Sequence, residues 1–173
     1  ASGAIRAFSS GPGDEFEPSW APDGKSIVFA VDKVRIDVQA LDGARRTVAQ
    51  VKPSADRFNA ASLSSPAFTA DGKDVVFTAI ENGKAELRNA TGVMVGGEDV
   101  FPFRISPLVG GGFVYTADGQ IKLRKASGET AVIAFTAAVP VLTPRYTKKS
   151  RDFLSAKTRP VVGIGRPALS PDG

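Results

Sequence analysis

The sequence predicts an all-β fold made of four-stranded antiparallel units, and three observations lead to this prediction. Apolar and polar residues alternate with a period of two in most segments, and turn residues recur about every 8–12 positions. A seven-residue phrase also occurs three times, at Pro18–Gly24, Pro66–Gly72 and Pro167–Gly173. Each copy ends in Asp-Gly, which favours a tight turn because Asp bonds to nearby backbone and Gly accepts positive φ.

The first unit is predicted over residues 17–52. Its four strands are expected at Pro18–Ala21, Ser26–Val31, Val34–Ala40 and Arg45–Val51. The third of these strands shows the clearest alternation, and Leu41-Asp42-Gly43 predicts the turn that joins it to the fourth.

The second unit is predicted over residues 64–103 and repeats this order. Its strands are expected at Pro66–Thr69, Asp74–Ile80, Ala85–Ala90 and near Asp99–Phe103. The dipeptide Asn82-Gly83 predicts a hairpin turn between the second and third strands.

The third unit, over residues 103–136, is a degenerate copy. Gly110-Gly111-Gly112 replaces the Asp-Gly turn, and Asp118-Gly119 predicts a second turn. Its strands are expected at Phe103–Pro107, Phe113–Thr116, Gln120–Lys125 and Ala131–Phe135. Gly72 follows Gly24 by 48 residues, and Gly110 follows Gly72 by 38. A repeat of about 40–50 residues with four strands is typical of a β-propeller blade. We therefore predict a partial β-propeller of four-stranded antiparallel blades.

The last part of the chain departs from this pattern. Residues 137–165 are predicted to form an irregular basic crossover, and residues 166–173 the start of another blade. Ala4–Phe8 alternates and is a candidate strand for closing the propeller on a blade beyond Gly173. The partner that closes the propeller is thus expected to be the remainder of its own polypeptide or further copies of the chain.

Composition restricts the chemistry that this chain can perform. It contains no Cys and no His. This excludes disulfides, thiolate zinc sites, His-bearing metal sites and nucleophiles activated by His. No apolar run approaches the ~18–20 residues that span a bilayer, and Ala1–Ser10 lacks the pattern of a signal peptide. No catalytic, cofactor-binding or metal-binding residue is assigned, and no cofactor is expected in this chain.

Three groups of residues are interpreted as structural. A solvated turn, rather than a calcium site with its six or more oxygen ligands, is expected for the acidic cluster Asp14, Glu15 and Glu17. Turn formation is expected for the repeated residues Asp23, Asp71 and Asp172, with a ring of carboxylates around a channel as the alternative. A place in the blade core is expected for the matching residues Trp20, Phe68 and Leu169.

Three further motifs carry no site. Gly163–Ala168 is not a dinucleotide loop, because Pro167 and the expected strand oppose a helix there. Asn89-Ala90-Thr91 fits a glycosylation sequon, a pattern that is common by chance. The basic stretch Arg145–Arg159 is interpreted as a linker whose charges face solvent or an acidic neighbour. Binding of nucleic acid is the less favoured reading, because basic charge would then spread over a whole face.

The residues that begin the first unit, Phe8–Gly24, resemble the blade start of TolB-like propellers, which are WD40-like folds built on SPDG repeats. Further segments, Ile133–Ala137, Arg151–Phe153 and Arg166–Gly173, are similar to large bacterial proteins in which such a propeller precedes a metal-dependent amidohydrolase barrel. Amidohydrolase barrels bind metal through His and Asp. The resemblance therefore implies that any catalytic domain lies outside these residues.

Two functions follow from this resemblance. The first is a propeller scaffold or binding domain in the N-terminal part of a larger metal-dependent amidohydrolase-like hydrolase, where it gates or docks the catalytic domain. The alternative is a stand-alone, TolB-like periplasmic protein-interaction module. A His-free carboxylate enzyme such as a glycosidase is a third and weaker reading. The resemblance implies a periplasmic or secreted location and peptide or protein ligands. From the charge pattern no nucleic-acid partner is expected, and from the short apolar runs no membrane span is expected.

Overall fold

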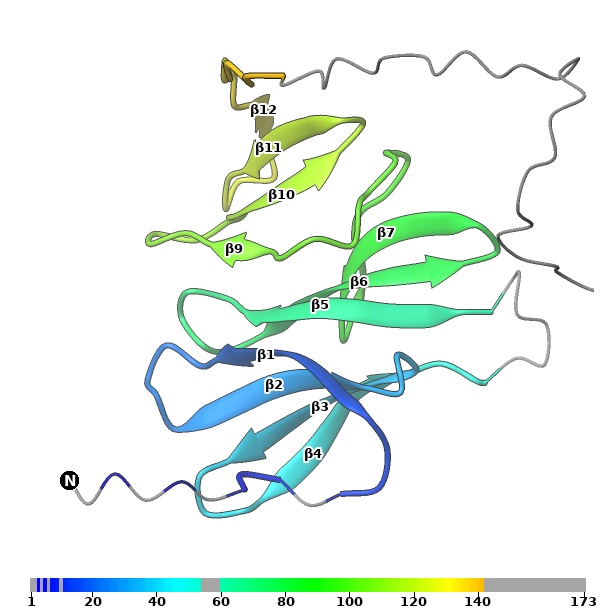
Figure 1. The fold of residues 1–173 in the computed structure, drawn as a ribbon, viewed down its shortest axis with the longest axis vertical. Coiled ribbons are helices and arrows are strands. Elements are labelled where there is room, and N and C mark those ends of the chain that lie inside the picture. The colour runs from blue at the N-terminus through cyan, green and yellow to red at the C-terminus, as the bar shows by residue number, and fades with distance from the viewer. Residues whose placement is uncertain (1–2, 4, 6, 10, 54–59, 142–173) are drawn as a thin grey trace, which may run out of the picture. The chain divides into compact units, whose positions relative to one another are not determined.

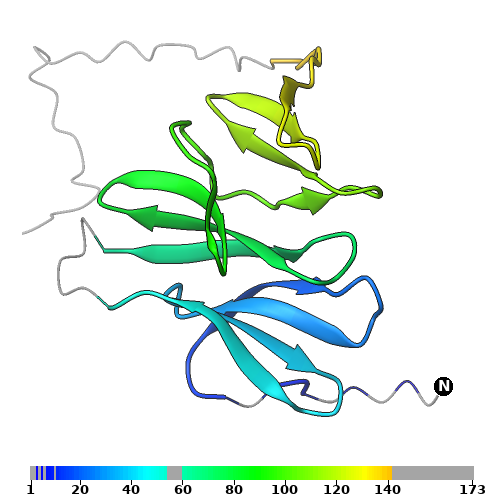
Figure 2. The same cartoon turned by 180° about the vertical axis from the view of Figure 1, so that it is seen from behind.

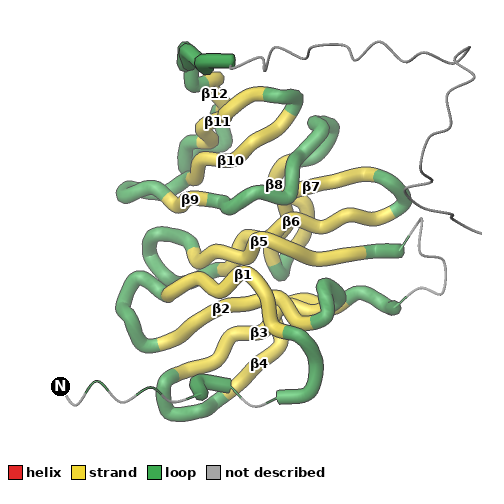
Figure 3. The backbone as a smooth tube through the Cα atoms, in the orientation of Figure 1, coloured by secondary structure: helices red, strands yellow, loops and turns green. Residues whose placement is uncertain are grey.

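A computed structural model describes residues 3, 5, 7–9, 11–53 and 60–141. These residues form three antiparallel sheets of four strands each, and no helix occurs among them (Figure 1, Figure 3). One compact unit ends at Thr136, and the described residues 137–141 belong to a second unit. Most of the predicted crossover and all of the predicted blade start at 166–173 lie outside the described residues.

Each sheet is a meander whose strands follow one another in chain order (Figure 2). The first sheet contains β1 (Glu15–Trp20), β2 (Ser26–Val31), β3 (Arg35–Ala40) and β4 (Arg45–Gln50). The second contains β5 (Ser62–Phe68), β6 (Val75–Glu81), β7 (Lys84–Asn89) and β8 (Gly92–Val95). The third contains β9 (Ser106–Pro107), β10 (Phe113–Ala117), β11 (Gln120–Arg124) and β12 (Thr130–Val132). The all-β prediction is confirmed.

The turns that join the first and second strands of each sheet lie on one side of the stack, at the left of Figure 1. In the first sheet, Asp23 Oδ1 accepts the N–H of Lys25 at 2.9 Å, and Gly24 has a φ of 67°. Asp71 accepts the N–H two residues on at 3.2 Å, and Gly72 has a φ of 71°. The predicted role of these two aspartates in turns is confirmed.

The hairpin turns on the opposite side also agree with the sequence. Asn82 and Gly83 have φ values of 52° and 72°, and Asp118 and Gly119 have values of 52° and 69°. Positive φ at both central residues is the conformation that matches the twist of paired strands. Both turns were predicted at these dipeptides and are confirmed.

The fourth strand of the second sheet lies earlier than predicted. It was expected near Asp99–Phe103, but β8 spans Gly92–Val95. The side chain of Asn89 explains this, because its Oδ1 accepts the backbone N–H groups two and three residues on, both at 3.0 Å. The chain therefore reverses directly after β7, and residues 99–103 lead toward the third sheet. The outer strands β9 and β12 are also shorter than predicted.

Two apolar layers hold the three sheets together. The layer between the first and second sheets includes Val28, Ala30, Ile36, Val38, Leu63, Phe68, Val75, Phe77 and Ala79. The layer between the second and third includes Ala67, Val76, Leu87, Val95, Val100, Ile105, Phe113, Tyr115 and Ala117. The second sheet is thus covered on both faces, which is why residues 75–79 of β6 are all buried.

The structure corrects the expectation that Trp20 is core. Its side chain is 57% exposed, whereas Phe68 is 5% exposed. Trp20 pairs with Ile27 and Phe68 pairs with Val75, so both side chains occupy the same face of their sheets. In the second sheet that face packs on the first sheet. In the first sheet it has no sheet against it within the described ranges. The side chain at this position is therefore buried only where a preceding blade packs against that face of the sheet. The matching residue Leu169 lies outside the described residues.

A charged cluster lies beside the layer between the second and third sheets. Lys122 Nζ lies 3.2 Å from the Glu98 carboxylate and also contacts the carboxylate of Asp118. The Tyr115 hydroxyl donates to Glu98 at 3.0 Å. The hydrogen bond from the Lys122 ammonium lowers the pKa of Asp118 below its usual value, and the backbone N–H of Asp99 lowers it further.

We expect Asp118→Asn to weaken the acid sensitivity of the chain. Because the pKa of Asp118 is lower in the folded state than in the unfolded chain, its stabilising contribution is complete above about pH 4 and is lost as pH falls through the folded-state pKa. Asn preserves the turn, since it tolerates the positive φ found here. The measurement is the urea midpoint at about pH 5.5 and about pH 3. The difference between wild type and variant should shrink at the lower pH.

Asp42→Asn is the control for this experiment, because it removes an exposed carboxylate that has no ion-pair partner among the described residues. It should leave the acid sensitivity unchanged. An Asp118→Asn variant whose deficit is the same at both pH values would show that the pairing with Lys122 does not stabilise the fold.

Candidate binding site

The first strands of the three sheets, β1, β5 and β9, are neighbours along one edge of the stack (Figure 1). A polar residue stands three residues before the last paired residue of each strand; it lies within β1 and β5, and in the third sheet it lies two residues before β9 begins. These residues are Glu17, Ser65 and Arg104. Glu17 and Ser65 lie at equivalent bulges and have nearly the same φ, 53° and 51°. The repeat has therefore placed three different polar groups along one edge.

Two of these side chains bond to the following sheet. The Glu17 carboxylate accepts the backbone N–H of Ser65. Ser65 Oγ donates to the carbonyl of Pro102, just before the third sheet, at 3.0 Å. Arg104, at the third equivalent position, is exposed and has no hydrogen-bond or ion-pair partner among the residues that the structure describes.

A groove of about 300 Å³ opens beside this row and is here called the inner groove. It is lined by Glu17, Pro18, Ser19, Ser65, Pro66, Pro102, Phe103 and Arg104. Prolines from three segments and the ring of Phe103 supply its apolar surface. Phe103 is 62% exposed and stacks on Phe101, with ring centroids 5.9 Å apart. Ser65 Oγ donates its hydrogen bond to a backbone carbonyl, and a carbonyl is not a base that could remove the hydroxyl proton. The arrangement is therefore suited to binding rather than to nucleophilic attack.

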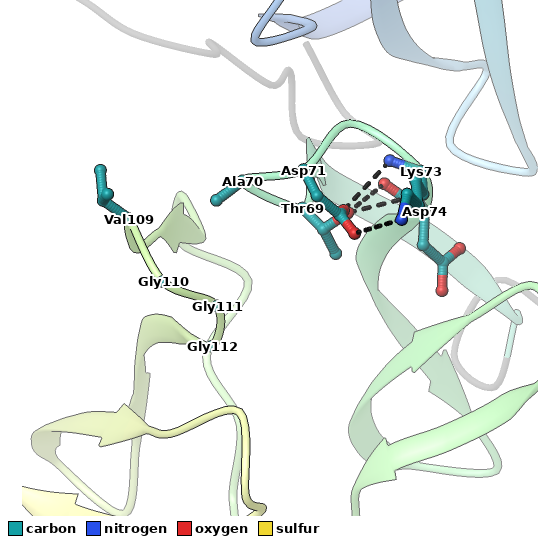
Figure 4. A pocket seen from close by; sticks show the side chains of 9 residues that line it. All are labelled: Thr69, Ala70, Asp71, Lys73, Asp74, Val109, Gly110, Gly111 and Gly112. Carbon is teal, nitrogen blue, oxygen red and sulfur yellow. Dashed lines mark hydrogen bonds and ion pairs between the residues drawn. The ribbon is translucent and has the colours of Figure 1, made fainter.

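A second hollow, of about 480 Å³, lies on the turn side between the second and third sheets (Figure 4). One wall is the turn Thr69–Asp74, and the other is the glycine turn Val109–Gly112. Thr69 Oγ1 donates to Asp71 at 2.7 Å, and this bond is the main reason why the pKa of Asp71 is lowered. Figure 4 shows the Asp71 side chain turned back onto its own turn, so it is engaged in holding that turn rather than in lining an acidic site.

A difference between the repeats makes room for this second hollow. In the first sheet Pro22 approaches the turn of the second sheet, because a Cβ built on Gly72 would lie 3.5 Å from Pro22 Cδ. Ala70 stands at the place of Pro22 in the second sheet and is smaller. Across from it, Gly112 has a φ of 83° and packs directly against backbone, since a Cβ there would lie 2.1 Å from the carbonyl oxygen of Arg124. No larger residue fits at Gly112.

Each sheet also carries an aromatic residue on its second strand opposite a charged residue on its third. In the first sheet Phe29 pairs with Asp37, whose carboxylate accepts Arg35 Nε at 3.0 Å and Arg45 Nε at 2.8 Å. The Arg45 guanidinium lies over the Phe29 ring at 4.8 Å. Despite its 2% exposure, Asp37 is therefore fully paired, with Thr47 Oγ1 donating at 2.9 Å.

The other two sheets carry a cation at this position instead. Phe77 pairs with Arg88, and Tyr115 pairs with Lys122. Arg88 forms ion pairs of 2.8 Å with each of two carboxylates, Glu81 and Glu86. Sequence reasoning missed this charged layer. The signal was present in the alternation of β3, which places Asp37 on the same face as its neighbours at two-residue spacing.

The residues of the predicted acidic cluster go to separate partners. Asp14 bonds through its backbone N–H to Asp32 Oδ1 at 2.8 Å, and Glu15 pairs with Arg45 at 3.0 Å. Glu17 alone lies in the inner groove. No group of three or more acidic side chains within the described ranges is placed to hold a metal ion. In the same ranges, no helix is long and apolar enough to cross a membrane.

Two solved structures are similar to this chain. One is TolB from Acinetobacter baumannii, with a TM-score of 0.56 and 24% identity, covering 74% of this chain and 34% of that chain. The other is TolB from Agrobacterium tumefaciens, with a TM-score of 0.50 and 18% identity, covering 75% of this chain and 49% of that chain. No family model and no curated protein matches the sequence. The chain therefore spans less than half the length of these structures and has the fold of part of a TolB-like β-propeller.

Proposed function

We propose that this chain is a binding domain that takes a peptide, protein or small ligand in the inner groove and does not itself catalyse a reaction. One observation carries the proposal: the inner groove is built from the first strands of two sheets and from the segment that leads into β9 of the third, in a fold that is part of a TolB-like propeller. Grooves that combine apolar walls with a few fixed polar groups are the usual form of ligand sites.

The proposal is tested by mapping ligand contacts. Amide chemical shifts of the labelled chain would be followed while mixtures of short peptides and aromatic fragments are added. We expect the shifts to concentrate at Ser65, Phe103 and Arg104. Shifts confined to other surfaces would contradict the proposed site, and turnover of amide or ester substrates that survives repurification would contradict a purely binding role.

The finer proposal is that this domain gates or docks a metal-dependent amidohydrolase domain in the same polypeptide. Its support is the resemblance of Ile133–Ala137 and Arg166–Gly173 to propellers fused to such barrels. The rest of the propeller then comes from the remainder of the polypeptide or from further copies of the chain. Reading the coding sequence beyond Gly173 tests this proposal. A barrel with His-X-His spacing supports it, and a stop after further blades supports the alternative of a stand-alone interaction module.

The proposed location is the periplasm or the cell exterior, and the TolB-like fold supports it. Fractionation of the source cells with an antibody to the chain tests the location. Recovery in the cytosolic fraction alone would contradict it.

A further inference from the structure

We infer that Arg104 makes the inner groove selective for a carboxylate carried on an aromatic or apolar body. The inference rests on the proposed function and specifies the chemical class of ligand for the same site. Its basis is the combination of a guanidinium that has no partner among the described residues, an exposed aromatic ring and proline surface in one groove of about 300 Å³.

The repeat places the Arg104 side chain at this edge for contact with a partner. The two equivalent side chains both make hydrogen bonds outside their own sheet, Glu17 to the N–H of Ser65 and Ser65 to the carbonyl of Pro102. Arg104 occupies the same position but has no such bond among the described residues. An Arg at this place brings five N–H donors in a planar fork, the geometry that matches a carboxylate with two parallel hydrogen bonds.

The charge balance of the groove also favours an anion at the Arg104 end. The other charged group that lines the groove is Glu17, and its carboxylate is engaged by the Ser65 N–H in the joint between the first and second sheets. Glu17 keeps its negative charge in that bond, so the groove carries one charge of each sign, and an anionic ligand group is expected at Arg104.

The apolar part of the ligand is accommodated next to that charge. Phe103 precedes Arg104, lines the same groove and presents a ring that is 62% exposed. Its stacking on Phe101 at 5.9 Å holds the ring in place, so an aromatic group meets a fixed surface. Pro66 and Pro102 complete this surface with rigid rings. The volume is at the small end of ligand sites, which suits a single aromatic acid or the last residue of a peptide.

The experiment compares acids with their neutral amides on the whole chain. The probes are phenylacetate and phenylacetamide, followed by a blocked tetrapeptide ending in Phe as the free acid and as the amide. Affinities come from titration of amide chemical shifts. We expect each acid to bind about tenfold more tightly than its amide, as a charge-assisted pair at a partly solvated site would give. If the free tetrapeptide acid binds more tightly than phenylacetate, a chain terminus is the source of the carboxylate. The reverse order indicates a small free acid.

Three variants complete the test. Arg104→Gln should remove the preference for acid over amide, and Arg104→Lys should keep part of it. Arg46→Gln, an equal change of charge at an exposed arginine outside the groove, should leave it intact.

Equal affinity for acid and amide in the wild-type chain overturns the inference but leaves the proposed binding function standing, because the groove is then still occupied. Absence of any shift in the groove overturns both. A lower melting temperature of Arg104→Gln with an unchanged acid preference also overturns the inference, because Arg104 would then serve as a bond between sheets, as Glu17 and Ser65 do.

Discussion

Phe68→Ala should lower the free energy of unfolding of the chain by about 3–5 kcal/mol, whereas Trp20→Ala should lower it by less than about 1 kcal/mol. The two residues occupy the same place in the repeat, so the difference between the two variants reports the effect of burial and not of position in the repeat. Phe68 is 5% exposed in the layer between the first and second sheets, and its removal leaves a cavity. Trp20 is 57% exposed and loses little contact.

Chemical denaturation of the purified variants measures this contrast. Because a domain of this kind is stabilised by only about 5–15 kcal/mol, Phe68→Ala alone could fail to fold. Phe68→Leu keeps most of the apolar volume and should lower the free energy of unfolding by less than about 1.5 kcal/mol. This variant can therefore be measured if Phe68→Ala does not fold. Equal losses for the Trp20 and Phe68 variants would mean that Trp20 is covered by another polypeptide segment in solution.

This contrast shows what the sequence could and could not predict. Alternation and Asp-Gly turns predict the strands of the first two sheets, because both signals act within a few residues. The repeat also places Trp20 and Phe68 at the same register. It does not predict that Trp20 is exposed, because its burial depends on whether another sheet lies against that face, which is not a local property.

The prediction of the fourth strand of the second sheet was wrong for a different reason. Residues 99–103 contain apolar and aromatic residues that suit a strand, while β8 is only four residues long and its first two residues, Gly92 and Val93, are exposed. The reversal is set by the Asn89 side chain, whose bonds to the following backbone compete with continued extension. The motif was considered as a sequon, and its role as a turn was missed.

The charged layer was missed because alternating polar residues are usually interpreted as solvent-facing. Asp37 is instead buried beneath the side chains of Arg35, Arg45 and Thr47 on its own sheet, so its carboxylate must be paired. The inner groove was missed for a related reason. Glu17, Ser65 and Arg104 share a position in the repeat but no chemistry, and their alignment becomes visible only from the strand pairing.

The paired state of Asp37 leads to the second large expected effect. Asp37→Ala should lower the free energy of unfolding by about 2–3 kcal/mol, somewhat less than the ~3–5 kcal/mol for breaking a fully buried ion pair, because both arginines retain some solvent contact. The variant removes the shared acceptor of Arg35, Arg45 and Thr47. Arg45 keeps its pair with Glu15 at 3.0 Å, but its contact over Phe29 loses the carboxylate that orients it.

Glu86→Ala is the matched control, since it removes a carboxylate from the equivalent layer of the second sheet. Arg88 keeps Glu81 as a partner at 2.8 Å, and the pair is partly exposed, so the expected loss is about 0.5 kcal/mol. The urea midpoints of the two variants show whether removing the carboxylate of Asp37 costs more stability than removing that of Glu86. If Asp37→Ala and Glu86→Ala lower the free energy of unfolding by the same small amount, the ion pairs of Asp37 only offset the cost of burying its charge. They would then add no net stability to the first sheet. A loss several times larger for Asp37→Ala shows that this buried carboxylate holds β3 and β4 together on the face that no described sheet covers.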